Sequence, residues 1–155
     1  MPTQQQLNDQ LFTEFFKLQP NEITIHELIQ QGADINAVDK YGESLLQTAV
    51  ESCGQGLELK YVQLLLNLHV NLEHQVDGFN CLFEAMLTYN LELCSMLLMA
   101  GVNPNCISSD THESLLDYSI SKLDFMELTE DIQVPTMREF IKLLVSFGAK
   151  SNYNS

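Results

Sequence analysis

The stretch GFNCLFEAMLTYNLELCSMLLMAGVNPN, residues 78–105, decides the fold of this chain. Its apolar residues fall into two groups, 82–86 and 91–98, with a polar break at 88–90 between them. Gly101 follows the second group, as expected at a helix C-terminus, because Gly adopts the left-handed conformation at no steric cost. The stretch therefore predicts two short helices back to back. Neither helix could bury its apolar face alone, so the unit needs similar units on either side.

Copies of both halves occur elsewhere in the chain. The second half recurs as LIQQGADIN (28–36), LLLNLHVNLE (64–73), MLLMAGVNPN (96–105) and LLVSFGAKSN (143–152). The first half recurs as GESLLQTAV (42–50), GFNCLFEAM (78–86) and HESLLDYSI (112–120). Such self-similarity, at a spacing in the thirties, is typical of proteins built from stacked helical repeats.

With these motifs the chain resembles the ankyrin-repeat family. QGADINA (31–37) followed by DKYG (39–42) nearly matches the family's junction between repeats, whereas its T-P-L-H motif is reduced to SLLQ (44–47), NCLF (80–83) and SLLD (114–117). In each of these a Ser or Asn retains an oxygen able to cap the inner helix. The resemblance covers about residues 22–153. It implies an all-α solenoid of about four helix-turn-helix repeats, near 4–37, 38–73, 74–105 and 106–153, within one domain, 1–155.

The predicted elements depart from the family pattern at four places. Residues 4–18 form an amphipathic helix without the T-P-L-H motif, which indicates an N-terminal cap, and a matching outer helix covers 23–31. Residues 51–58 form a longer loop. His69 replaces the Gly that ends the outer helix, so it must adopt the left-handed conformation if that turn is kept. The fourth inner helix runs from Leu115 to about Phe125, then an acidic insertion ending at Pro135 precedes the last outer helix, 136–147. We interpret the insertion as a loop, or as an extension of the inner helix that packs on something.

The charge balance limits the classes of partner. The chain of 155 residues has a formal net charge of −14, and between residues 61 and 137 Lys122 is the one base. An acidic surface repels phosphate backbones and anionic lipids, which argues against nucleic-acid and membrane partners and favours a basic protein. We expect a monomer.

The N-terminal residues lack the basic and apolar regions of a secretory signal, which predicts a cytoplasmic protein, or one delivered to a host cytosol by another route. The cysteines at 53, 81, 94 and 106 lack a C-x-x-C spacing, which favours thiols in a reducing compartment.

We expect no catalytic residue, metal or cofactor. The chain has no Gly-rich phosphate loop, nucleophile elbow or metalloprotease pattern. The acids Asp124, Glu127, Glu130 and Asp131 lack the spacing of a calcium loop, and the pair Cys106 and His112 implies no oxyanion donor.

The resemblance also implies which residues contact a partner. In ankyrin-repeat proteins the finger tips and the exposed face of the inner helices form a concave groove that typically does so. The matching positions are Lys40, Tyr41, Glu43, Glu51 and Ser52 in the second repeat; Val76, Asp77, Phe79, Leu87 and Thr88 in the third; and Asp110, Thr111, Glu113, Ser121 and Lys122 in the fourth. Glu84 and Asp117, on the inner helices, would add to the negative charge of this groove.

Apolar Val76, Phe79 and Leu87 occupy positions where solvent-facing residues are expected. They either form a partner-facing patch or pack against neighbouring fingers. The function predicted from the resemblance is non-catalytic protein binding. The alternatives are an acidic inhibitor or immunity-type protein that neutralises a basic toxin or nuclease, an effector acting in a foreign cell, and an enzyme hidden in the insertions.

Overall fold

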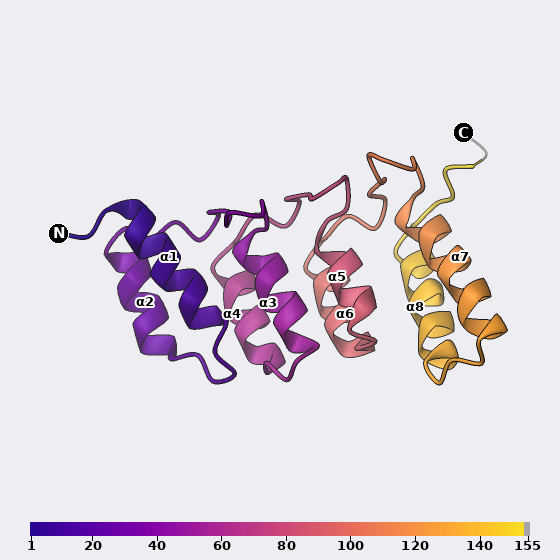
Figure 1. Cartoon of the computed structure of the whole chain (residues 1–155), viewed down its shortest axis with the longest axis horizontal. Helices are drawn as coiled ribbons and strands as arrows, with labels where there is room; N and C mark the ends of the chain where they lie inside the picture. Colours follow the sequence, from indigo (N-terminus) through magenta and orange to yellow (C-terminus); the bar gives the residue numbers. More distant parts are fainter. Residues whose placement is uncertain (154–155) are drawn as a thin grey trace. The chain divides into compact units, whose positions relative to one another are not determined.

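The computed structural model describes residues 1–153, which contain eight α-helices and no β-strand (Figure 1). The all-α prediction is therefore confirmed. The helices are α1 (Gln4–Phe15), α2 (Glu22–Gln30), α3 (Leu45–Cys53), α4 (Leu59–Asn67), α5 (Cys81–Leu87), α6 (Leu91–Met99), α7 (Leu115–Leu128) and α8 (Val134–Ser146).

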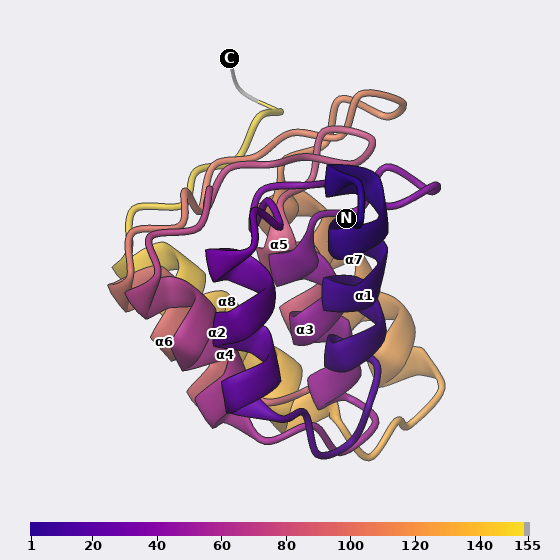
Figure 2. The ribbon, with the colours of Figure 1, turned by 90° about the vertical axis from the view of Figure 1, so that its left-hand side faces the viewer.

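The chain divides into two compact units, one of residues 1–74 with α1 to α4 and the other from residue 75 onward with α5 to α8. Each unit contains two helix pairs. In the N-terminal unit, α1 and α3 lie on one side and α2 and α4 on the other (Figure 2). The organisation of residues 1–155 as one domain stays a prediction.

Each unit has its own apolar core. In the N-terminal unit Phe15, Ile25 and Leu65 are completely buried, and in the C-terminal unit so are Leu93 and Leu115. These residues come from several helices of their unit, so each helix pair buries its apolar face against the other, as the sequence repeats predicted.

The inner helices begin at the polar residues that the sequence indicated. Ser44 Oγ accepts a hydrogen bond from the Gln47 backbone N–H, 3.1 Å, and the Gln47 side chain accepts one from the Ser44 N–H, 2.9 Å. This reciprocal pair satisfies two donors that the helix leaves unpaired. Asn80 and Ser114 cap α5 and α7 by a single hydrogen bond each, in which the side-chain oxygen accepts from the backbone N–H of Leu82 and of Asp117. The caps therefore survive the loss of the family's T-P-L-H motif.

The outer helices end in a left-handed residue at equivalent positions. Gly32, Gly101 and Gly148 occupy this position with φ values of 112°, 103° and 92°. His69 occupies it after α4 with φ 57°, the conformation that keeping this turn requires. The turn is thus kept, at the steric cost that a side chain has in this conformation.

The fourth helix pair differs from its prediction at both sides of the insertion. Helix α7 continues to Leu128, about one turn beyond the predicted end, because Met126 is buried and fixes the extension. Helix α8 begins at Val134 rather than at 136, with Pro135 in its first turn. Proline fits there because the first turn of a helix has no partner for its backbone N–H. The first helix, predicted over 4–18, ends at Phe15.

Candidate functional site

The second finger, residues 38–44, projects an aromatic side chain into solvent. Asp39 Oδ1 accepts hydrogen bonds from the backbone N–H groups of Tyr41, 2.8 Å, and Glu43, 3.0 Å, which fixes the turn. His74 Nε2 donates to the Gly42 carbonyl oxygen, 2.6 Å. The Tyr41 side chain is 73% exposed, and Lys40 Nζ lies 5.0 Å from its ring centre. Lys40 and Tyr41, two predicted contact residues, are thus on the surface of a braced turn.

A groove of about 600 Å³ separates this finger from α1. Exposed Phe16 and Val38 contribute apolar surface, and Asp9 and Asp39 contribute carboxylates. We call it the finger groove; its lining residues are Gln5, Asp9, Phe12, Phe16, Val38, Asp39, Lys40 and Tyr41. It is an open groove, of a size that can take a side chain or a short segment of a partner.

The contribution of α1 to this groove was missed from the sequence, which assigned that helix the role of a cap. A detectable pattern was present. Gln5, Asp9, Phe12 and Phe16 follow one another at intervals of three or four residues, so they lie along one side of the helix. Phe16 follows the buried Phe15 directly and is exposed, because neighbouring helical residues point in different directions.

Three carboxylates gather next to the finger groove. Glu43 is half-buried, and its pKa is raised by burial and by repulsion from the carboxylates of Glu51 and Asp39. A raised pKa means that the negative charge on Glu43 is disfavoured where it stands. Glu43, Glu51 and Asp39 therefore form an acidic cluster. A cation that bound to this cluster would relieve the repulsion among its carboxylates.

One predicted contact residue of the third finger, Phe79, proves to be buried. Phe79 was expected to face solvent, but its ring is only 8% exposed and stacks on Phe83 with ring centres 4.9 Å apart. Tyr118 of α7 meets the Phe79 ring edge-on at 5.8 Å. Phe79 is therefore a packing residue, although the rings that it contacts lie on α5 and α7 rather than on neighbouring fingers. Among its predicted companions, Val76 and Glu84 are half-buried, and Asp77 and Leu87 are exposed.

Thr88 lies at the C-terminus of α5 and is half-buried. Its hydroxyl donates to the Ala85 carbonyl oxygen, 2.6 Å, and accepts from the Asn90 N–H, 3.2 Å. These bonds connect the two helices of the third pair, so Thr88 has a structural task where the sequence predicted a partner contact.

A second predicted contact residue, on α7, also proves to be buried. Asp117 was expected to line the groove, but it is 3% exposed. Its Oδ2 accepts hydrogen bonds from the Asn152 backbone N–H, 2.7 Å, and from Ser114 Oγ, 2.9 Å. Asp117 therefore ties the C-terminal segment to the start of α7.

The other predicted residues of the fourth repeat remain accessible in part. Asp110 and Thr111 are exposed at the finger tip, Ser121 is exposed on α7, and Lys122 is half-buried. Glu113 is half-buried and accepts a hydrogen bond from the Tyr153 hydroxyl, 2.6 Å. The second and fourth repeats thus each keep three exposed residues among their five predicted positions, and the third keeps two. In the second repeat the exposed residues are Lys40, Tyr41 and Glu51.

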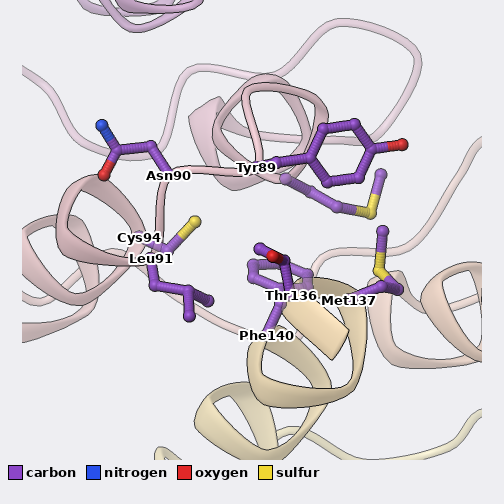
Figure 3. Close-up of a pocket in the computed structure, with 8 residues that line it drawn as sticks. Tyr89, Asn90, Leu91, Cys94, Thr136, Met137 and Phe140 are labelled. Atoms are coloured by element: carbon purple, nitrogen blue, oxygen red, sulfur yellow. The ribbon is translucent and has the colours of Figure 1, made fainter. Parts of the chain in front are cut away.

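A small hollow in the C-terminal unit is filled by its own lining. Figure 3 shows Tyr89 and Cys94 on one side of this hollow and Met137 and Phe140 on the other. The space between them has no room for a water molecule. Burial, together with the Asp131 carboxylate and Tyr118, raises the pKa of Tyr89. This hollow is a packing contact rather than a ligand site.

Residues 1–153 contain no group of three or more His, Cys, Asp or Glu side chains that could hold a metal ion. All four cysteines are thiols rather than disulfides. Burial raises the pKa of Cys53 to about 11 and that of Cys94 to about 12, so both thiols stay protonated and are poor nucleophiles at neutral pH. Within the described range, no helix has both the length and the apolarity that crossing a bilayer requires.

Comparison with known proteins agrees with this geometry. A family model for ankyrin repeats in three copies matches residues 18–108. The chain belongs to the ankyrin-repeat family. Its fold is the all-α ankyrin solenoid that the repeats predicted. It is also similar to the ankyrin repeat protein L91 of Acanthamoeba polyphaga mimivirus, with 34% identity over 117 residues, which are 70% of this chain and 18% of that protein.

Ankyrin repeats are generally protein–protein interaction modules, and the family is typically non-enzymatic. This chain spans less than a fifth of the mimiviral relative.

Proposed function

We propose that this chain is a non-catalytic binding module, and that its protein partner presents a basic segment with an apolar side chain to the finger groove. The observation that carries the proposal is the acidic cluster of Asp39, Glu43 and Glu51 beside the exposed Phe16 and Tyr41. The groove thus combines apolar surface with excess negative charge.

Electrostatics favours a basic partner. Burial, and after it repulsion from Glu51 and Asp39, raises the pKa of Glu43, and Asp9 adds a further carboxylate to the groove lining. A Lys or Arg side chain would remove this repulsion on binding. A phosphate backbone or an anionic lipid surface would increase it, so the same cluster disfavours those partners.

Apolar contact would supply most of the affinity. Exposed Tyr41 and Phe16 are large, and aromatic anchors of this kind often dominate the energetics of protein interfaces. The braced second finger holds Tyr41 in place before binding, which reduces the entropy lost when the complex forms. The carboxylates would then mainly set the association rate and the choice of partner.

One sharper form of the proposal is an inhibitor that covers the basic surface of a toxin or nuclease with these carboxylates. We further propose that the protein acts in a reducing compartment such as the cytosol. The absence of disulfides among its four cysteines supports that placement.

The test starts with affinity purification of the partner from the native source, and then measures its association rate between 0.1 and 1 M salt. The Debye length falls from about 10 Å to about 3 Å over this range, so association should slow markedly. The double substitution Glu43→Gln with Glu51→Gln should lower the rate at 0.1 M salt and flatten its salt dependence. Tyr41→Ala should weaken binding by about 1 to 3 kcal/mol through faster dissociation.

A matched control is Glu27→Gln with Glu92→Gln, which removes the same charge from exposed residues of the outer helices α2 and α6. This variant should keep most of the salt dependence. Equal effects of both double variants would show that net charge, rather than the finger groove, attracts the partner. Co-purification of a small molecule in place of a protein would contradict the proposal itself.

A further inference from the structure

The end of α7 carries apolar side chains that the fold does not bury. Helix α7 has 14 residues, whereas α5, the inner helix of the preceding pair, has 7. The additional turns expose Phe125 and Leu128, and the connection to α8 exposes Ile132; these side chains are 66%, 84% and 90% exposed. We call these three residues the α7 ledge.

The fold itself does not require the α7 ledge. Met126, 3% exposed, anchors the extension in the core, and α8 packs through Met137, Phe140 and Leu144, which are also buried. Single exposed apolar residues are common on protein surfaces, but three large ones within eight positions are an unusual concentration of exposed apolar side chains. Such a concentration is more typical of an interaction site than of a packing need.

Acidic residues alternate with the ledge along the chain. Asp124, Glu127, Glu130 and Asp131 lie between or next to its members. Glu127 is paired with Arg138 of α8, 2.6 Å. The other three acids form no ion pair within residues 1–153, so the ledge has net negative charge at its border.

We propose that the α7 ledge binds an amphipathic helix of a protein partner, with an apolar stripe flanked by Lys and Arg. The partner's apolar stripe would cover Phe125, Leu128 and Ile132, and its basic residues would face the acids. This surface is separate from the finger groove, and the inference does not depend on the function proposed for that groove.

The shape of the ledge favours a helix as its occupant. The backbone donors and acceptors of α7 are used within the helix, so a partner cannot add to it as a strand and must dock through side chains. Phe125 and Leu128 are three positions apart on α7 and therefore share a face. A second helix presents apolar residues at the same intervals, so the two faces can interdigitate.

Charge argues against other occupants. A second copy of the chain would bring the same four acids to the contact, and like charges there would oppose association. An anionic bilayer surface would be repelled in the same way. A basic amphipathic helix is the occupant whose apolar and charged parts both complement the ledge.

The probe is a fluorescently labelled synthetic helix with leucine on one face and lysine on the other, titrated with the full chain and followed by anisotropy. Two peptides serve as comparisons: one of identical composition in scrambled order, and one with glutamate in place of lysine. The amphipathic lysine peptide should bind at least about tenfold more tightly than either. Equal binding of the scrambled peptide would overturn the proposal, because it would reflect net charge alone.

The double variant Phe125→Ala with Leu128→Ala should weaken peptide binding at least about tenfold and leave the thermal midpoint unchanged, because both side chains are exposed. The matched control is Ile23→Ala with Met99→Ala, which removes exposed apolar side chains elsewhere, 70% and 76% exposed. Its binding should stay within about twofold of wild type. Equal losses in the two double variants would refute the ledge as the site. Self-association that the ledge variant abolishes, measured by sedimentation, would replace the helix with a second copy as the occupant.

Discussion

The second and third fingers have matching sequence positions but orient their aromatic residues in opposite ways. Tyr41, before the glycine of the second finger, is 73% exposed, whereas Phe79, after the glycine of the third, is 8% exposed. At the position of Phe79 the second finger has Glu43, which is half-buried. In both fingers the position after the glycine is therefore less exposed than the position before it. An apolar residue after the glycine is thus expected to pack against the fold.

The two turns are also held by different contacts. In the third finger Asp77 and Gly78 both have positive φ, 54° and 88°, and Val76 and Phe79 exchange two backbone hydrogen bonds, 2.9 and 3.1 Å. This is a two-residue hairpin of the type that Asp-Gly favours. The Asp77 carbonyl oxygen also accepts from the Ser109 N–H of the fourth finger, 2.8 Å. The third finger is thus fixed to its neighbour.

The largest predicted effect compares the two finger glycines. A Cβ at Gly78 would overlap the Ile107 carbonyl oxygen and lie 2.7 Å from the Ser109 nitrogen, whereas a Cβ at Gly42 meets nothing within 4 Å. Both glycines have positive φ, so Ala costs about 1 kcal/mol at either position for the backbone alone. At Gly78 the overlap should add about 2 to 3 kcal/mol, because the obstructing atoms are backbone.

Urea unfolding of Gly78→Ala and Gly42→Ala measures this difference directly. Similar losses of unfolding free energy in the two variants would show that the third finger moves away from the fourth at little cost.

The next effect compares the two aromatic residues. Phe79→Ala removes a ring that is buried and stacked on Phe83, and it should lower the free energy of unfolding by about 3 kcal/mol. Tyr41→Ala removes an exposed ring and should change it by less than about 0.5 kcal/mol. Thermal and urea unfolding of both variants provide the measurement. A Phe79→Ala protein as stable as wild type would restore the prediction of a solvent-facing patch.

Periodic features of the sequence predicted the fold well. The repeated apolar groups located the helices, and the caps at Ser44, Asn80 and Ser114 followed from residue type alone. The sequence made the left-handed conformation of His69 a condition for keeping the turn, and the turn is kept; His112, which replaces the glycine of the fourth finger, also has a positive φ, 60°. The repeat thus imposes its turns even where a side chain opposes them.

The candidate site was predicted less completely, because exposure depends on contacts distant in sequence. Phe79 is buried by Tyr118, and Asp117 by the segment around Asn152, neither of which is near it in the chain. Conversely, Phe16 enters the finger groove because α1 packs beside the second finger. The family resemblance assigns the same contact positions to every repeat, so it cannot predict contacts that one repeat makes and another does not.

The smallest effect, on pH dependence, compares the buried Asp117 of the fourth repeat with exposed Asp110 at its finger tip. Burial alone would raise the pKa of Asp117. Hydrogen bonds with Asn152, Ser151 and Ser114 outweigh the effect of burial and hold this pKa below its ordinary value. A lowered pKa in the folded state means that the ionised form stabilises the fold. This contribution is present in full above the pKa of the unfolded state, near 3.8, and is lost as the pH falls through the lower folded value.

Asp117→Asn should therefore lower the free energy of unfolding by about 1 to 2 kcal/mol at pH 7, the difference between charged and neutral hydrogen bonds. The difference in stability between this variant and wild type should disappear below about pH 4. Asp110→Asn removes the same charge from an exposed residue and therefore controls for the change in net charge. Urea unfolding of the three proteins at pH 7, 4 and 3 decides the matter, since a constant gap between wild type and Asp117→Asn at every pH would mean that packing, and not the charge on Asp117, fastens the C-terminal segment to α7.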